Sequence, residues 1–159
     1  MTGWQVLTRM HEFHIGAADP ALPEAVVLLD ELSERLAAIT GSSGRSSFDP
    51  EDVRVPGALF VLACNVDGKA VGCGAFRPMG EGVAEVKRMY AQVAGAGLAI
   101  LMHLEAAARE YGYHRLRLET RLVNQRAVAF YEKHGYTRIP NFGKYAGRPE
   151  AVCFEKILN

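Results

Sequence analysis

Two turn signals in the middle of the chain constrain its fold more than any other feature. Asp67-Gly68 separates two apolar runs within residues 58–76, and Gly80-Glu81-Gly82 leads into a third run at 83–90. An Asp-Gly pair between apolar runs is a strong hairpin signal, because glycine adopts the left-handed backbone that a tight turn requires. The middle of the chain is therefore predicted to be an antiparallel meander of strands.

Helical patterns precede and follow this meander. After Pro23, apolar residues recur at helical spacing up to a stop at Gly41. Further helices are predicted over 98–111 and 124–134. A short helix is expected after Asp49-Pro50, and strands at 11–15, 115–119, 136–139 and 151–157. This order predicts one α+β (mixed α/β) domain spanning residues 1–159, because the repeated early crossovers of a dinucleotide-binding fold are missing.

Composition excludes several classes of protein. The 159 residues are 49% hydrophobic and carry 18 basic and 18 acidic side chains, which indicates a globular protein without the basic excess of a nucleic-acid binder. No apolar run is long enough to span a membrane, and no signal peptide is evident. Cys64, Cys73 and Cys153 are odd in number and far apart, so we expect buried reduced thiols and a cytoplasmic protein. His11 and His14 would face opposite sides of a strand, and no metal site is predicted.

The run Gln92-Val93-Ala94-Gly95-Ala96-Gly97 lies between a predicted strand and a predicted helix. A helix N-terminus has free N–H groups and a partial positive charge, so a turn stripped of side chains there can bind phosphate. The glycines could equally serve only a tight turn and close packing of helix on sheet. The run by itself leaves both interpretations open.

A second motif, NQRAVAFYEKHGY at 124–136, follows the strand-like RLRLET. Together with AEVKRMY and the glycine run it resembles the GNAT superfamily of N-acetyltransferases, from about Phe60 to the C-terminus. Gln92, Gly95 and Gly97 match the superfamily's Q/R-x-x-G-x-G/A loop, and 94–99 is an alternative register. The matches to the later motif are Asn124, Ala127, Phe130, Tyr131, Glu132, Lys133, Gly135 and Tyr136. The resemblance implies a central, mostly antiparallel twisted sheet with helices on both faces.

The resemblance also implies a cosubstrate, acetyl-CoA, with no metal. Its binding residues would be Met89, Tyr90, Ala91, Gln92, Ala94, Gly95, Ala96, Gly97, Leu98 and Asn124. The backbone N–H near Met89 would polarise the thioester carbonyl, the glycine loop would hold the pyrophosphate, and Asn124 would bond the pantetheine arm. Tyr90-Ala91-Gln92 runs almost directly into the glycines, a shorter connection than is usual, which keeps a noncatalytic acyl-CoA-binding domain as an alternative.

Three residues are the catalytic candidates. Tyr131 would donate a proton to the departing CoA thiolate, and Glu85, on the strand that lines the thioester, would take the proton of the amine, with Glu119 as the second choice. Glu85 could instead be a solvated or ion-paired strand residue, Tyr131 a core residue, and Asn124 only a helix cap. The predicted activity is acetyl transfer to the primary amine of a small molecule, with a peptide or protein amine as the alternative. Residues 41–48 and 141–149 would wall the acceptor site, and a homodimer is left open.

Overall fold

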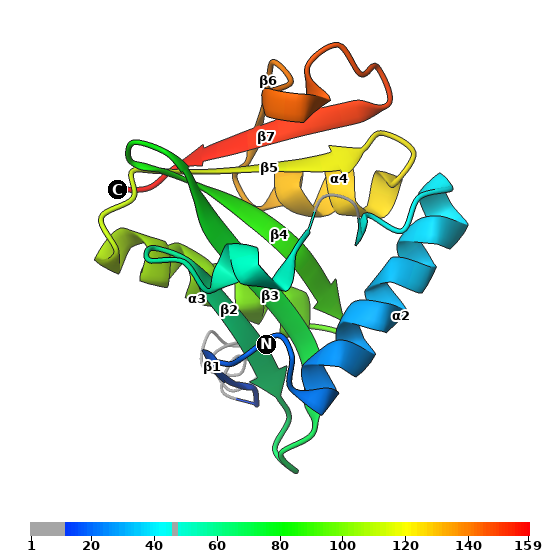
Figure 1. Ribbon diagram of the computed structural model, residues 1–159, viewed down its shortest axis with the longest axis vertical. Coiled ribbons are helices and arrows are strands. Elements are labelled where there is room, and N and C mark those ends of the chain that lie inside the picture. The colour runs from blue at the N-terminus through cyan, green and yellow to red at the C-terminus, as the bar shows by residue number, and fades with distance from the viewer. Residues whose placement is uncertain (1–11, 46–47) are drawn as a thin grey trace, which may run out of the picture.

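The computed structural model describes residues 12–45 and 48–159, and within them a single seven-stranded sheet forms the centre of the molecule (Figure 1). The strand order is β1-β2-β3-β4-β5-β7-β6. The strands are β1 (His14–Ala17), β2 (Leu59–Cys64), β3 (Ala70–Gly80), β4 (Val83–Ala91), β5 (Arg115–Arg121), β6 (Thr137–Ile139) and β7 (Ala151–Ile157). The helices are α2 (Pro23–Thr40), α3 (Ala96–Glu110) and α4 (Gln125–Lys133), with 3₁₀ turns η2 (Pro50–Val53) and η3 (Gly143–Tyr145).

The predicted turns form where the sequence placed them. At the β2–β3 turn, Gly68 has φ +83°, and the Asn65 side-chain oxygen accepts hydrogen bonds from the N–H groups of Asp67 and Lys69, both at 3.0 Å. All neighbouring strands pair antiparallel except β4 and β5, which are parallel. The prediction of a mixed α/β fold with a mostly antiparallel sheet is confirmed.

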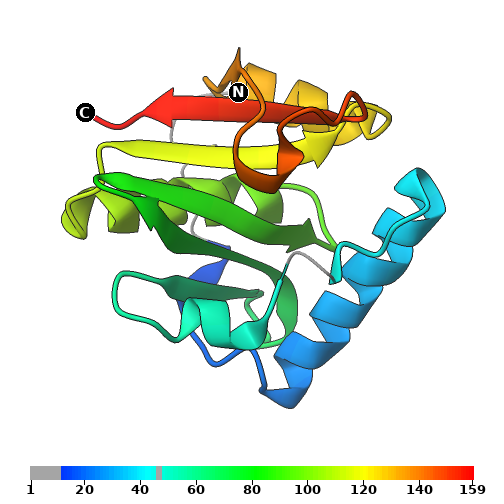
Figure 2. The same cartoon turned by 45° about the horizontal axis from the view of Figure 1, so that its top comes forward.

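Helices cover both faces of the sheet, as the resemblance implied (Figure 2). On β2, Phe60 and Leu62 point into the core beneath α2, whereas Val61 and Ala63 point into the larger core beneath α3 and α4. This alternation is the period of two that a sheet buried on both faces requires. On α2, Leu28 is almost fully buried, and burying such a side chain contributes about 1.5–3 kcal/mol.

The pairing of β4 with β5 covers only the first part of both strands. Val83–Glu85 pair with Arg115–Arg117, after which β4 continues to Ala91 and β5 to Arg121 with no further pairing between the two described strands. Figures 1 and 2 show the two strands separating toward the end of α2. The sheet is thereby opened in its middle.

A β-bulge in β4 accompanies this opening. Cys73 of β3 pairs with Tyr90 and Ala75 pairs with Lys87, so two residues of β4, Arg88 and Met89, oppose one residue of β3. Arg88 has φ +55°, and among the described residues it is the one non-glycine with a positive φ. The extra residue reverses the side-chain alternation of β4 beyond this point.

The first predicted strand is the main correction to the element boundaries. It was expected over 11–15, whereas β1 is His14–Ala17 because these four residues pair with Val61–Cys64; His11 lies outside the described residues. Cys73 and Cys153 are buried free thiols as predicted, whereas Cys64 is partly exposed. Within the described parts of the chain, no helix combines the length and apolar character needed to cross a membrane.

Candidate active site

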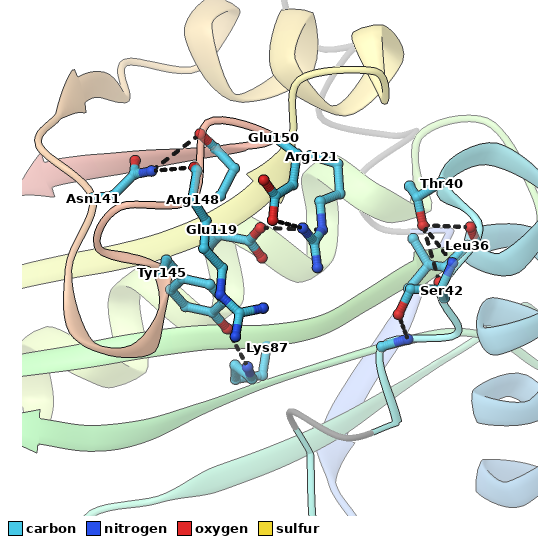
Figure 3. Close-up of polar contacts among 12 residues, drawn as sticks. Leu36, Thr40, Ser42, Lys87, Glu119, Arg121, Asn141, Tyr145, Arg148 and Glu150 are labelled. Atoms are coloured by element: carbon cyan, nitrogen blue, oxygen red, sulfur yellow. Dashed lines mark hydrogen bonds and ion pairs between the residues drawn. The ribbon is translucent and has the colours of Figure 1, made fainter.

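A cleft of about 420 Å³ occupies the opening between β4 and β5. Its walls come from four parts of the chain: the end of α2 with the segment after it, the bulged part of β4, the unpaired end of β5 with the start of α4, and the loop that contains η3. Residues of both predicted acceptor walls line it, namely Ser42 and Gly44 from one and Lys144, Tyr145 and Arg148 from the other. Figure 3 shows both sides of the cleft, with Thr40 at the end of α2 and Ser42 after it on one side, and Glu119, Tyr145 and Arg148 on the other.

The bulge directs Arg88 toward α2. Its guanidinium donates hydrogen bonds to the Ser33 hydroxyl at 2.5 Å and to the carbonyl oxygens of Ser43 at 3.3 Å and Leu29 at 3.4 Å. Burial lowers the pKa of Arg88 from its usual value. Arg88 therefore ties the segment after α2 to the strand that lines the cleft, and Met89 beyond it packs against the core of the opposite face.

The glycine run forms the turn into α3, and none of its residues lines this cleft. Gly95 is the N-cap, with φ +87°, and Ala96 begins the helix. The N–H groups of Ala96 and Ala99 bond to Val93 and Gly95, whereas the first turn of a helix offers no carbonyl to the N–H groups between them. These are the N–H groups of Gly97 and Leu98, which the resemblance assigned to phosphate.

Gly97 lies beside two side chains without being crowded by them. A Cβ built there would lie 3.8 Å from the Ala91 Cβ and from the Phe130 ring, an ordinary contact distance. Close packing alone therefore does not require glycine at this position, although the turn does lie beside α4. The free N–H groups and positive end of α3 at this turn favour an anion.

The side chain of Gln92 is engaged away from the turn. It donates a 2.7 Å hydrogen bond to Oε2 of Glu31 on α2, and the Tyr90 hydroxyl donates to the same oxygen at 3.0 Å. These two bonds lower the pKa of Glu31. Gln92 and Tyr90 thus hold the end of β4 against α2, and phosphate binding at this turn would fall to backbone N–H groups.

Tyr131 and Asn124 bring α4 to the cleft. Tyr131 is 7% exposed and packs edge-on against Tyr136, with ring centroids 5.6 Å apart. No residue in the described part of the chain bonds its hydroxyl, and burial raises the Tyr131 pKa, so the hydroxyl remains protonated at neutral pH. Asn124 caps α4 by accepting from the Ala127 N–H at 3.3 Å, and it also lines the cleft. Both residues therefore have a packing role and a place beside the cleft.

Glu119 is a carboxylate of the cleft itself. Its side chain is 13% exposed, its Oε2 is buried without a hydrogen bond, and the nearest cationic atom is Arg121 Nε at 3.7 Å. Burial raises the pKa of Glu119, with Arg121 and Lys87 acting in the opposite direction. A weakly solvated carboxylate with a raised pKa is suited to take a proton near neutral pH.

Glu85 lies on the other side of Lys87. It lines a neighbouring cavity of about 650 Å³ and accepts a 3.1 Å hydrogen bond from Arg77 Nε, with Lys87 Nζ at 3.7 Å from its second oxygen. Glu85 is therefore an ion-paired strand residue in this structure, which was the alternative to its role as the base. The structure brings Tyr131, Asn124 and Glu119 to one cleft and places Glu85 at the adjoining one.

Several residues of the cleft were not among the predicted site residues. Lys87 is 8% exposed, donates to the Tyr145 hydroxyl at 3.2 Å, and has a pKa lowered mainly by burial (Figure 3). Arg121 and Arg148 also line it. The sequence offered a signal only for Lys87, because a lysine on a strand of mostly apolar residues is unusual.

Cys73 is no alternative nucleophile, because burial raises its pKa to about 12. No group of three metal-ligating side chains occurs among the residues described.

Comparison with known proteins identifies the family to which this fold belongs. A model of the acetyltransferase (GNAT) family matches residues 28–136. The chain belongs to the GNAT family of acetyltransferases. The predicted family and enzyme class are thereby confirmed. This GNAT protein is 33% identical over 148 residues to the IAA acetyltransferase of Azospirillum brasilense, covering 89% of this chain and 96% of that one.

Solved structures agree with this assignment. A Klebsiella pneumoniae protein assigned to the acyl-CoA N-acyltransferases is 31% identical, with a TM-score of 0.77 over 92% of this chain and 98% of that one. The PaiA N-acetyltransferase of Thermoplasma acidophilum, solved with coenzyme A, has a TM-score of 0.73 at 20% identity, covering 91% of this chain and 98% of that one. The second similarity is one of fold alone. A GNAT fold with a CoA-bound neighbour supports binding of an acyl-CoA.

Proposed function

We propose that this GNAT protein transfers the acetyl group of acetyl-CoA directly to the primary amine of a small molecule. The observation that carries the proposal is the single cleft at the parting of β4 and β5, which is lined by a buried, protonated Tyr131, by Asn124 and by the desolvated carboxylate of Glu119. An acid and a base beside one opening are the groups that acyl transfer to an amine needs.

Acetyl-CoA would be held largely by backbone groups. The turn at Gly97 and Leu98 offers N–H groups and the positive end of α3 to the pyrophosphate. The unpaired part of β4 offers backbone groups to the pantetheine, the Met89 N–H would polarise the thioester carbonyl, and Asn124 would bond the pantetheine arm. The glycine at position 97 supports this assignment, since a Cβ there would meet its neighbours only at 3.8 Å and packing alone does not require glycine.

In the proposed reaction the amine nitrogen attacks the thioester carbonyl carbon. A C–N bond forms, and the C–S bond breaks with its electron pair on sulfur. Glu119 or Glu85, directly or through water, takes the proton that nitrogen loses, and Tyr131 gives its hydroxyl proton to the sulfur. Solvent exchange returns both side chains to their starting states, and the products are an acetamide and the CoA thiol. The place of Glu119 in the cleft supports it as the base over Glu85, whose oxygens are engaged by Arg77 and Lys87.

The proposal is tested by titrating acetyl-CoA, CoA and NAD by calorimetry and by following thiol release with a panel of amines. The panel includes small amines, a peptide amine and IAA, for which the Azospirillum relative is named. Acetyl-CoA binding with amine-dependent thiol release and a recovered acetamide is the expected result. Tight acetyl-CoA binding without transfer to any acceptor would instead favour a noncatalytic acyl-CoA-binding domain. Propionyl-CoA in the same assay tests whether the acetyl group is preferred.

A further inference from the structure

Basic side chains outnumber acidic ones around the cleft. One carboxylate, Glu119, lines it, against five cationic side chains: Lys87, Arg88, Arg121, Lys144 and Arg148. None of the residues of the glycine turn at the start of α3 lines the cleft, so the excess lies apart from the turn proposed to bind phosphate. The whole chain is neutral, with 18 basic and 18 acidic side chains, which makes the excess a local feature.

Three of the five cations form no ion pair with a carboxylate within residues 12–45 and 48–159. Lys87 pairs with Glu85, and Arg121 pairs with Glu150 at 3.1 Å. Arg88 bonds to a hydroxyl and to carbonyl oxygens, with the charge of Asp30 acting on it from a longer distance. No described carboxylate forms an ion pair with Lys144 or Arg148; burial raises the pKa of Glu119, and Lys144 is among the cations that act to lower it. Lys144 and Arg148 are exposed at the mouth of the cleft, and an excess of positive charge there attracts an anion.

The backbone around Arg148 is held in place. The Asn141 amide donates to the carbonyl oxygens of Arg148 at 3.0 Å and Ala151 at 3.3 Å, and the Arg148 N–H donates to the Tyr145 carbonyl at 3.1 Å. Figure 3 shows Arg148 on this loop beside Glu119, Tyr145 and Lys87. An arginine guanidinium can bind a carboxylate through two parallel hydrogen bonds, which gives orientation as well as attraction.

We propose that the acceptor carries a carboxylate besides its amine and that Arg148, with Lys144, binds this carboxylate. The inference rests on the proposed function and narrows its substrate class to amino-carboxylates. Such an acceptor would place its anionic end on the η3 loop and its amine toward Glu119. Polyamines, which would add positive charge to a cleft that already carries an excess, would be disfavoured.

The test compares matched acceptors by kcat/KM. 4-Aminobutyrate and 4-aminobutanol share an amine and a chain length and differ in the carboxylate, and spermidine represents the polycations. We expect amino-carboxylates to be preferred by at least tenfold. In Arg148→Gln the KM for 4-aminobutyrate and longer amino-carboxylates should rise at least tenfold, while their kcat and the kinetics of 4-aminobutanol change little. Arg138→Gln is the matched control, because Arg138 is exposed on β6, pairs with Glu132 and does not line the cleft.

Acetyl-CoA affinity measured by calorimetry should be the same in Arg148→Gln and in the wild type, which separates acceptor binding from cosubstrate binding. Equal or better use of 4-aminobutanol or spermidine would overturn the inference while leaving the proposed function intact. An equal loss for charged and neutral acceptors in Arg148→Gln would also overturn it. Failure to bind acetyl-CoA, or absence of thiol release with every acceptor, would overturn the proposed function and the inference that rests on it.

Discussion

Replacing Gly97 with alanine separates the two interpretations of the glycine turn, because they predict different combinations of stability and binding. Gly97 lies in the first turn of α3 without a positive φ, and its new Cβ would meet Ala91 and Phe130 at an ordinary 3.8 Å. Alanine in a helix is favoured over glycine by about 0.5–1 kcal/mol. For a chain of this size that gain raises the melting temperature by about 1–4 °C in the absence of ligand.

Binding should change in the opposite direction. The added methyl would crowd the turn that carries the N–H groups of Gly97 and Leu98, where we propose that the pyrophosphate lies. We expect CoA affinity to fall at least tenfold, about 1.4 kcal/mol. With CoA at a hundred times the wild-type Kd, the wild type would gain about 2.7 kcal/mol of stability and the variant about 1.4 kcal/mol. The variant should therefore melt above the wild type without CoA and lose that lead when CoA is added.

Calorimetric titration and thermal melts measured on the same samples provide the assay. Gly112→Ala is the control, since Gly112 follows the opposite end of α3 with φ +92° and no atom within 4 Å of a built Cβ. Its left-handed conformation should cost alanine about 1–2 kcal/mol of stability without changing CoA affinity. A folded Gly97→Ala and a folded Gly97→Val that both bind CoA as tightly as the wild type would refute the phosphate turn.

The other expectations concern the acid, the base and a buried ion pair. Tyr131→Phe should keep fold and acetyl-CoA affinity but lower turnover by about a hundredfold, and unchanged turnover would make Tyr131 a core residue only. Glu119→Gln should lower turnover most at neutral pH and recover partly at high pH, where free amine is plentiful, whereas the same profile in Glu85→Gln would assign the base to Glu85. Because burial raises the Glu119 pKa, the folded state binds the extra proton, so Glu119 weakens folding as pH rises through that pKa. Glu119→Gln should accordingly raise the melting temperature at neutral pH and not below the ordinary pKa of a glutamate, and an unchanged difference across pH would contradict this. Glu105→Gln should cost about 1–3 kcal/mol in chemical denaturation, because Glu105 accepts from Lys156 at 3.0 Å in the core.

Local chemistry made much of the fold predictable. Asp67-Gly68 and Gly41 specify a turn and a helix end through glycine's access to positive φ, which depends on no distant residue. Tyr131 and Asn124 were identified as site residues because the segment 124–136 resembles a GNAT motif that contains both. Tyr131 packs in the core and Asn124 caps α4, and both also line the cleft because α4 lies beside the opening of the sheet.

The arrangement of the carboxylates was not predictable in the same way. Alternation along 83–90 correctly puts Glu85 and Lys87 on one face, but it cannot reveal which cavity that face adjoins. That depends on where β5 leaves β4 and on where the η3 loop returns, both long-range features of the sheet. Glu119 acquires its raised pKa from burial, and no described donor bonds its Oε2, which depends on the residues that the fold packs around it.

The bulge at Arg88 connects these features physically. A non-glycine residue with φ +55° costs on the order of 1 kcal/mol or more, and the three hydrogen bonds that Arg88 donates to Ser33, Ser43 and Leu29 offset that cost. Without the extra residue, strand alternation would turn position 88 toward the core of α3 and α4, and the guanidinium could not reach the end of α2. The same backbone irregularity therefore interrupts the pairing of β4 with β3 beside the cleft and holds the wall formed by the segment after α2. Because Arg88 determines both the path of β4 and the position of the segment after α2, this acceptor wall is coupled to the strand that would hold the thioester.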